Sequence, residues 1–394
     1  MPNKDVFIVS GARTAMAEYG GALRDLSAIE LGAVASKAAL DRSPIPKDSI
    51  DHVVIGNALQ TSGDAIYGAR HVGLKAGLSI DTPALTVNRL CGSGIQAIVS
   101  GAQMIQLGEA GAVLAGGMES MSQAPHVLRG ARWGFRLGEG KLEDSLMVAL
   151  LDTHCGYYMA QTAENLAARY GITREEQDQY ALSSQMRAAA AWDSGLFGGE
   201  VVAVELKSRK GPTLFAKDDH LRPDTTMEGL AKLKPAFSKD GFVTAGNASG
   251  IVDGAAAVVI ADEETLHKFD ASPLGRIVSW AVAGVPPEIM GIGPVPSSKK
   301  ALQAAGLSLD QIDLVEVNEA FAGQYLAVER ELGLDRDRTN VNGGAIALGH
   351  PLAASGTRLV LTVLLELGRR KKKYGLATAC IGGGQGIAMV IEAL

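Results

Sequence analysis

A cysteine at a predicted strand-to-helix junction is the first candidate for chemistry in this sequence. Cys91 follows an extended apolar segment, residues 83–87, and precedes a predicted helix of small residues over 95–107. A helix N-terminus offers free backbone N–H groups and the positive end of the helix dipole, which favour thiolate over thiol. Gly92 and Gly94 allow a sharp turn and leave room for a substrate. Cys91 could therefore be a nucleophile, or a small apolar filler, as many unpaired cysteines are.

Three further residues stand in segments that suit a reactive site. They are Asn318, His350 and Cys380, and each is expected at a strand end or a helix start. Taken singly, each has a structural explanation: a helix cap, a turn histidine and a core cysteine. Together with Cys91 they fall at equivalent places of one repeated scaffold, which favours a shared site.

The last third of the chain repeats the first. Residues 309–315 resemble residues 47–53 at an offset of 262 positions, and the same offset maps Ser93 onto Ser355. Matched residues at one fixed offset, in matched contexts, indicate an internal duplication. The chain is therefore expected to contain two like halves.

The duplication should bring the candidate residues together. Cys91 begins a central helix of the first half, and residues 350–356 begin the equivalent helix of the second. After an insertion of two residues, 111–115 aligns with 375–379, so Cys380 ends the equivalent strand. Sites in α/β proteins gather at the carboxyl ends of strands and at helix N-termini. We expect the two halves to face each other there.

Composition narrows the class of protein. The chain has 394 residues, of which 47% are hydrophobic and 48 are glycine, and this predicts layered α/β units with tight turns. A net charge of −6 gives no global attraction for nucleic acid or a membrane surface. Three cysteines without a close pair argue against a disulfide framework and against a zinc site. With no signal peptide and no long apolar run, a cytoplasmic protein is expected.

The order of predicted elements gives the domain organisation. A strand over residues 6–9, a turn-rich segment over 10–21 and a helix from about 27 to 39 open an α/β layer. This alternation is suspended after residue 120 and resumes near residue 250. The predicted units are a first half of residues 1–120 plus 251–272, an inserted loop domain of 121–250 and a second half of 273–394.

Taken together, the motifs resemble the thiolase family over the whole chain. The matching segments begin at Cys91 (Cys-Gly-Ser-Gly), Gly116 (Gly-Gly-Met-Glu-Ser), Asn247 (Asn-Ala-Ser-Gly), Asn318 (Asn-Glu-Ala-Phe), Gly349 (Gly-His-Pro) and Cys380 (Cys-Ile-Gly-Gly-Gly). The resemblance implies duplicated α/β halves stacked in five layers, αβαβα, with an inserted loop domain. The implied reaction is thiolytic cleavage of a 3-oxoacyl-CoA, or its reverse, Claisen condensation of two acyl-CoA molecules.

The resemblance also implies roles for five residues. Cys91 would carry the acyl group, His350 would take its proton, and Cys380 would move the proton at the α-carbon. His350 and a water held by Asn318 would form one oxyanion hole, and the backbone N–H groups of Cys91 and Gly382 the other. No metal or redox cofactor is implied, because CoA and acyl-CoA are substrates.

Further positions are assigned to the substrate by the same resemblance. Those facing CoA and the acyl group would be Arg222, Ser249, Ala245, Ala248, Met159, Phe237, Ala320 and Phe321. A solvated surface charge remains the alternative for Arg222, and plain core packing for Phe237. Tyr158 stands where the family often has histidine, which leaves the acyl length open. We expect short to medium chains.

Two other functions remain open at this point. A decarboxylating ketoacyl synthase shares the duplicated fold and a nucleophilic cysteine, but it uses a Cys-His-His set, so Cys380 speaks against it. A non-catalytic acyl-CoA binding protein on the same scaffold would be expected to lose at least one of four residues. Cys91, Asn318, His350 and Cys380 are all present.

The resemblance implies a homo-oligomer, a dimer or a tetramer. The apolar and basic segment 125–141, which contains Trp133 and Phe135, could join two dimers. The alternative is that this segment only covers the substrate pocket. We expect a dimer of dimers.

Overall fold

The two halves of the chain each contribute one sheet, and the sheets meet along a short seam. The computed structural model describes residues 4–209 and 211–394. The strands follow the order β15-β16-β17-β14 in the second half and β1-β13-β5-β3-β4 in the first. Their bounds are Val6–Thr14 (β1), His52–Gly56 (β3), Ala84–Val87 (β4), Ala112–Glu119 (β5), Val252–Asp262 (β13), Gly275–Gly284 (β14), Leu314–Val317 (β15), Tyr374–Ile381 (β16) and Gln385–Ala393 (β17). At the seam β1 and β14 run antiparallel, with Val6 opposite Ile277.

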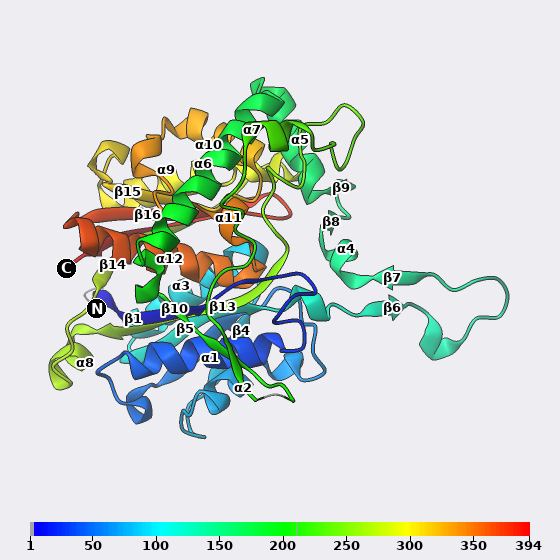
Figure 1. Cartoon of the computed structure of the whole chain (residues 1–394). Coiled ribbons are helices and arrows are strands. Elements are labelled where there is room, and N and C mark those ends of the chain that lie inside the picture. Colours follow the sequence, from blue (N-terminus) through cyan, green and yellow to red (C-terminus); the bar gives the residue numbers. More distant parts are fainter. Residues whose placement is uncertain (1–3, 210) are drawn as a thin grey trace.

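Helices cover both faces of each sheet and give five layers (Figure 1). The helices α1 and α2 lie outside the first sheet, α3 and α12 lie between the sheets, and α9 and α10 lie outside the second. Their bounds are Ala28–Asp41 (α1), Gly68–Lys75 (α2), Ser93–Gln106 (α3), Pro294–Ala305 (α9), Ala322–Leu332 (α10) and Leu352–Arg370 (α12). Because α12 contacts strands of both sheets, it is buried almost all round. The expected αβαβα arrangement is confirmed.

The central helices α3 and α12 approach closely at equivalent glycines. A Cβ atom on Gly94 would lie 2.5 Å from the backbone nitrogen of Thr357, and one on Gly356 would lie 2.6 Å from that of Ile95. Neither position can hold a side chain without moving a backbone. The two glycines are related by the sequence offset, so the duplication places the first turns of both helices side by side.

The first strand is longer than the sequence predicted. We expected a strand over residues 6–9 followed by turns, but β1 continues to Thr14. After a bulge between Ile8 and Ser10, its second part pairs with β13 in the antiparallel direction. The prediction was wrong because this pairing is with residues far away in the sequence.

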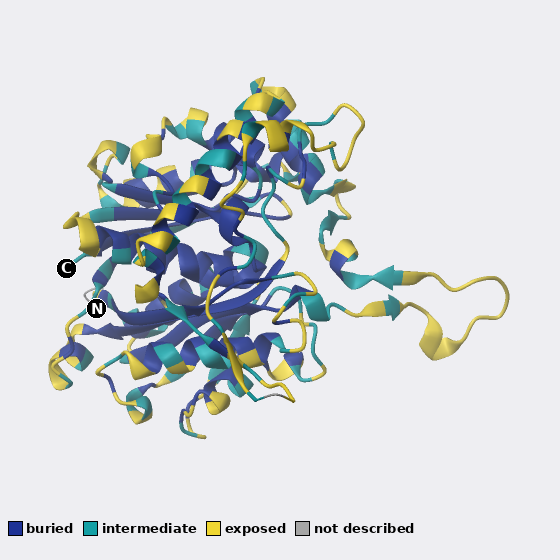
Figure 2. Ribbon diagram, in the orientation of Figure 1, coloured by how far each residue is buried: buried dark blue, intermediate teal, exposed yellow. Residues whose placement is uncertain are grey.

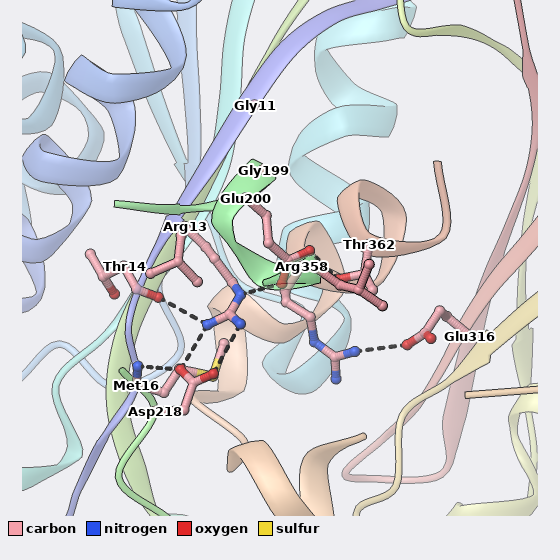
Figure 3. Close-up of polar contacts among 12 residues, drawn as sticks. Gly11, Arg13, Thr14, Met16, Gly199, Glu200, Asp218, Glu316, Arg358 and Thr362 are labelled. Carbon is pink, nitrogen blue, oxygen red and sulfur yellow. Dashed lines mark hydrogen bonds and ion pairs between the residues drawn. The ribbon is translucent and has the colours of Figure 1, made fainter. Parts of the chain in front are cut away.

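A buried ion network ties the inserted segment to both halves (Figure 3). Arg13 of β1 donates from Nε to Glu200 at 2.6 Å and from Nη1 to Asp218 at 2.8 Å. Glu200 also accepts a hydrogen bond from Thr362 of α12, at 2.8 Å. Buried charges are tolerated when they are paired in this way. Residues from the first half, the insertion and the second half therefore share one polar cluster.

The chain leaves the first sheet at the end of β5 and returns to it at β13. The intervening segment contains α4 (Ser145–Ala149), α5 (Met159–Tyr170), α6 (Arg174–Asp193) and α7 (Met227–Ala231). Of these, α5 and α6 pack against α10 of the second half. The strands β6 (His126–Leu128) and β7 (Leu142–Asp144) form a hairpin arm that projects away from the body (Figure 1). Short strands complete the segment: Leu151–Asp152 (β8), Tyr157–Tyr158 (β9), Val201–Val202 (β10), Val204–Leu206 (β11) and Thr213–Phe215 (β12).

Burial follows the layers. Figure 2 shows the buried residues in the sheets and the central helices, while the hairpin arm is largely exposed. Within the described residues, no helix is both long enough and apolar enough to cross a bilayer. Over the same residues, no group of His, Cys, Asp and Glu side chains has the arrangement of a metal site.

Candidate active site

Cys91 lies in a strained turn between β4 and α3. Leu90, the residue before it, has a φ of 47°, which is uncommon for a residue with a branched side chain. The turn is held by Ser93, whose hydroxyl donates to Leu90 O at 2.7 Å and accepts from the backbone N–H of Arg89 at 2.8 Å. The sulfur is therefore presented by a fixed backbone rather than by a mobile loop.

The electrostatics of Cys91 differ from what its position at a helix start led us to expect. Burial raises the pKa of its thiol to about 11, although a hydrogen bond from the backbone N–H of Gly382 opposes this shift. The nearby carboxylate of Glu119 raises the pKa further. The helix start favours the thiolate, but loss of water costs the anion more than the helix terminus returns. The thiol must lose its proton as it reacts.

His350 stands at the start of α12, after the short helix α11 (Ala345–Leu348). Its backbone N–H donates to Gly250 O at 3.0 Å, which fixes it against the end of the inserted segment. Its Nδ1 lies 2.5 Å from Oγ of Ser355, and its Nε2 lies 3.3 Å from Nδ2 of Asn318. Both ring nitrogens therefore have defined partners.

The imidazole of His350 is uncharged at neutral pH. Burial lowers its pKa to about 3, and the positive charge of Arg358 contributes to this shift. Arg358 is itself buried one helical turn after Ser355, and its Nη1 donates to Glu316 at 2.8 Å (Figure 3). A neutral imidazole can accept a proton, so His350 has the state that a general base needs.

Asn318 and Cys380 complete the centre of the site. Cys380 ends β16 and is fully buried, and burial raises the pKa of its thiol, as does the charge of Cys91, while a hydrogen bond from Asn318 opposes both effects. Asn318 follows β15, and its Oδ1 is buried without a hydrogen-bond partner in the described part of the chain. A polar atom in that state is suited to hold a water or a substrate atom.

One cavity of about 230 Å³ connects most of the expected residues. Those that line it are Cys91, His350, Met159, Phe237, Ala248, Ser249, Ala320 and Phe321. Tyr158 also forms part of its wall, and its ring lies 6.4 Å from that of Phe237. Ser249 stands among mainly apolar side chains in this lining, as polar residues do in sites that hold an extended organic ligand.

A second cavity, of about 220 Å³, opens on the other side of Cys91. Gly382 and Gly383 line it together with apolar residues that include Leu90 and Leu150. Gly383 has a φ of 79°, so the turn that places the N–H of Gly382 near the sulfur requires glycine there. Cys91 is thus accessible from two directions.

Arg222 and Ala245 lie apart from the catalytic centre, in a third cavity of about 460 Å³. The Arg222 side chain is half-exposed, and its guanidinium donates to Asp219 O at 2.7 Å and forms an ion pair with Glu18. His220 contacts the same Glu18 carboxylate at 3.0 Å. The residues expected to face CoA are therefore divided between two cavities.

Two buried residues near the site were not singled out from the sequence. Glu119 accepts hydrogen bonds from Asn57, from the backbone N–H groups of two residues after β3 and from that of Ala353. Burial raises its pKa to about 7. Ser355 contacts His350 directly. The only signal for Ser355 was its match to Ser93 across the duplication.

Comparison with known proteins agrees with this geometry. The family description "Thiolase, N-terminal domain" matches residues 6–264, and "Thiolase, C-terminal domain" matches residues 271–393. The chain is 56% identical to human mitochondrial 3-ketoacyl-CoA thiolase over 390 residues, 99% of this chain and 98% of that protein. It is 52% identical to the acetyl-CoA acetyltransferase of Escherichia coli (strain K12) over 397 residues, 99% and 100% of the two chains.

A solved structure extends the similarity to three dimensions. The crystal structure of human mitochondrial 3-ketoacyl-CoA thiolase in complex with CoA has a TM-score of 0.97 at 55% identity, covering 99% of this chain and 98% of that one. These comparisons give no support to a ketoacyl synthase or to a non-catalytic binding protein. The matches span both halves, so the chain belongs to the thiolase family and is an acyltransferase.

Proposed function

We propose that the protein is an acetyl-CoA C-acyltransferase that cleaves 3-oxoacyl-CoA with CoA, and runs the reverse condensation, through an acyl-Cys91 intermediate. The observation that carries this proposal is the meeting of Cys91, His350, Asn318 and Cys380 at the junction of the two halves. The names of the relatives support it, since they are thiolases and acetyl-CoA acetyltransferases, and one solved relative contains CoA.

In the first half-reaction the Cys91 sulfur attacks the 3-oxo carbon while Nε2 of His350 takes the thiol proton. The oxyanion that forms faces the N–H groups of Cys91 and Gly382, and each such donor is worth about 3 to 4 kcal/mol of barrier. The bond between C2 and C3 then breaks. The electron pair leaves as the enolate of acetyl-CoA, which takes a proton from Cys380.

The enolate is stabilised on the opposite side of the site. Its oxygen faces the protonated Nε2 of His350 and a water held by Asn318, whose Oδ1 is buried without a protein partner in the described residues. Acetyl-CoA leaves, and the proton on His350 passes to the Cys380 thiolate. His350 is then neutral again and Cys380 is again a thiol.

In the second half-reaction a CoA thiol attacks the acyl group on Cys91. His350 takes the proton of that thiol and returns it to the departing Cys91 sulfur. These steps use thiols, imidazole and backbone donors alone, so we propose that no metal or redox cofactor takes part. CoA and acyl-CoA act as substrates.

The cavities suggest how the substrate is held. The pantetheine arm follows Ser249 and Ala248 through the first cavity, and the nucleotide end reaches Arg222 and Ala245 in the third. The acyl chain occupies the apolar space around Cys91, including the second cavity. That space is small, so we propose short to medium chains. Kinetics with four-, six- and ten-carbon 3-oxoacyl-CoA substrates test this preference.

The hairpin arm supports a further proposal, a dimer of dimers. Trp133 and Leu137 at its tip are 87% and 97% exposed, and β6 and β7 pair only with each other among the described strands. Exposed apolar patches of this kind mark association surfaces. Light scattering on the protein and on a variant lacking residues 129–141 is expected to show a tetramer and a dimer, respectively. Equal masses would refute the proposal.

A cytoplasmic location stays a prediction, since the human relative is named for the mitochondrion.

The reaction itself is tested with acetoacetyl-CoA and CoA. We expect the wild-type protein to form acetyl-CoA, Cys91→Ser to lose at least about 10³-fold in kcat, and Cys155→Ser to keep full activity. Cys155 is a matched control because it also lies part-buried in the chain, outside the cavities that Cys91 lines. Undiminished cleavage by Cys91→Ser would overturn the proposal.

A further inference from the structure

We propose that Ser355 is a positioning residue that fixes His350 in the tautomer with the proton on Nδ1 and the lone pair on Nε2. This inference deepens the proposed function, because it rests on His350 acting as the base for Cys91. It concerns which ring nitrogen is free to accept a proton. Histidine has two neutral tautomers, and the partner of one nitrogen decides the state of the other.

The contacts of the Ser355 hydroxyl point to this assignment. Its Oγ lies 2.5 Å from Nδ1 of His350 and 3.2 Å from the carbonyl oxygen of Pro351. All three groups are buried, so water does not compete freely for them. A hydroxyl has one proton to give, and a carbonyl can only accept. When Ser355 donates to Pro351, it is left to accept from the N–H at Nδ1.

The first half of the chain contains an equivalent serine whose hydrogen-bond directions are unambiguous. Ser93 is the duplicated counterpart of Ser355 and also stands in the first turn of a central helix. Its hydroxyl donates to the carbonyl of Leu90 and accepts from the backbone N–H of Arg89. A backbone N–H can only donate, so these directions are fixed. In both halves the serine joins one carbonyl to one N–H.

The surroundings of Nε2 agree with the assignment. Nε2 lies 3.3 Å from Nδ2 of Asn318, which can only donate, and the same side chain donates to Cys380. In the opposite tautomer an N–H at Nε2 would face this amide N–H, and two buried donors would be left opposed. With the lone pair on Nε2, that contact is a hydrogen bond.

This arrangement suits a base that must remain uncharged until it reacts. A carboxylate in the place of Ser355 would select the same tautomer but would also favour the imidazolium. A hydroxyl selects the tautomer without adding a charge, and the buried ring stays neutral. When Nε2 takes the proton of Cys91, the N–H at Nδ1 keeps its acceptor. The two duplicated serines thus hold the two reacting side chains, Ser93 the nucleophile and Ser355 the base.

The direct test is ¹⁵N NMR of wild-type protein labelled at histidine, with His350 assigned by comparison with His350→Gln. At pH 7 we expect Nδ1 of His350 to carry the proton and Nε2 to be unprotonated. A protonated Nε2 in the wild-type protein would overturn the inference. This measurement needs no variant of Ser355 to fold, and it does not depend on thiolase activity.

Variants then test the consequence for catalysis. Ser355→Ala is expected to shift His350 toward the Nε2-protonated form and to lower kcat by about 10- to 10²-fold, with KM changed by less than about twofold. Ser355→Thr, which keeps a hydroxyl, is expected to restore the tautomer and most of kcat. Ser93→Ala, the matched control, is expected to lower activity through Cys91 while leaving the tautomer of His350 unchanged.

The outcomes separate this inference from the proposed function. Wild-type kcat in Ser355→Ala, or a low kcat with an unchanged tautomer, would overturn the role of Ser355 and leave the thiolase reaction intact. Absence of acetoacetyl-CoA cleavage by the wild-type protein would instead overturn the proposed function. The NMR result would still stand on its own in that case.

Discussion

The amide nitrogen of Asn318 lies 3.3 Å from Nε2 of His350, at the buried junction of the two halves. Asn318 follows a strand of the second sheet, whereas His350 begins a central helix, so this contact joins two layers. In this contact the amide N–H of Asn318 donates and Nε2 of His350 accepts. The contact also places Oδ1 of Asn318, which has no hydrogen-bond partner among the described residues, beside the proposed base, where the proposed oxyanion hole would hold a water.

Replacement of Asn318 tests that oxyanion hole. We expect Asn318→Ala to lower kcat for acetoacetyl-CoA cleavage by about 10²- to 10³-fold, the usual loss for one oxyanion-hole donor. Formation of acetyl-Cys91 from acetyl-CoA should be affected less, because that step uses the N–H groups of Cys91 and Gly382. Rapid-quench kinetics separate the two steps. Equal losses in both would contradict separate oxyanion holes.

The protonation state of Cys91 can be measured directly. Burial raises the pKa of its thiol to about 11, so the thiol should stay protonated at pH 7 and ionise only as the pH approaches that value. Thiolate absorbance near 240 nm, taken as the difference between wild type and Cys91→Ser, reports this. A thiolate signal at neutral pH would show that Cys91 and His350 form an ion pair instead.

Acid sensitivity should depend on His350. Its pKa is about 3 in the folded protein against 6.5 for an ordinary histidine, so between these values the unfolded chain binds the extra proton. Above about pH 6.5 His350 is neutral in both states and does not lower the free energy of unfolding. As the pH falls toward 3, protonation of the unfolded chain lowers the free energy of unfolding progressively. Between pH 6 and pH 4, the free energy of unfolding should fall more steeply in wild type than in His350→Gln, by up to about 1.4 kcal/mol per pH unit. Urea titrations at a fixed protein concentration measure this, and parallel curves would contradict it.

Glu18 is expected to weaken the binding of CoA in the third cavity. Its carboxylate forms an ion pair with Arg222 and would lie near the CoA phosphates proposed to bind there. Removal of one negative charge at about 4 Å is worth about 1 kcal/mol in water, so Glu18→Gln should lower KM for CoA about fivefold with kcat unchanged. Glu228→Gln is the control, because Glu228 pairs with Lys232 outside that cavity. A raised KM in Glu18→Gln would show that Glu18 instead holds Arg222 in a binding position.

Sequence patterns indicated candidate reacting groups but not their electrostatics. Cys91, His350 and Cys380 could be predicted because they lie in distinctive motifs and the duplication related their positions. The raised pKa of Cys91 could not be predicted, since the desolvation that causes it comes from side chains spread over both halves. The full length of β1 was missed for a similar reason. Its second part depends on pairing with β13, and Arg13 depends on Glu200 and Asp218, far away in the sequence.

The ion-pair and hydrogen-bond partners of residues near the proposed substrate site could not be predicted from the sequence either. That Arg222 faces CoA stays a prediction, and its ion pair with Glu18 joins the short strand Ala17–Glu18 (β2) to the inserted segment. Ser355 was visible only as the match to Ser93, and nothing in that match showed that its hydroxyl would meet an imidazole. Such contacts depend on rotamers and packing, which short motifs do not encode.

The central claim is that Cys91 carries the acyl group, and mass spectrometry tests it most directly. The wild-type protein is incubated with acetyl-CoA, quenched in acid, digested and mapped at its three cysteines. The expected result is an acetyl group on Cys91 and none on Cys155 or Cys380, with the label removed when CoA is added. An acetyl group on Cys155 or Cys380, with Cys91 unmodified, would contradict the account.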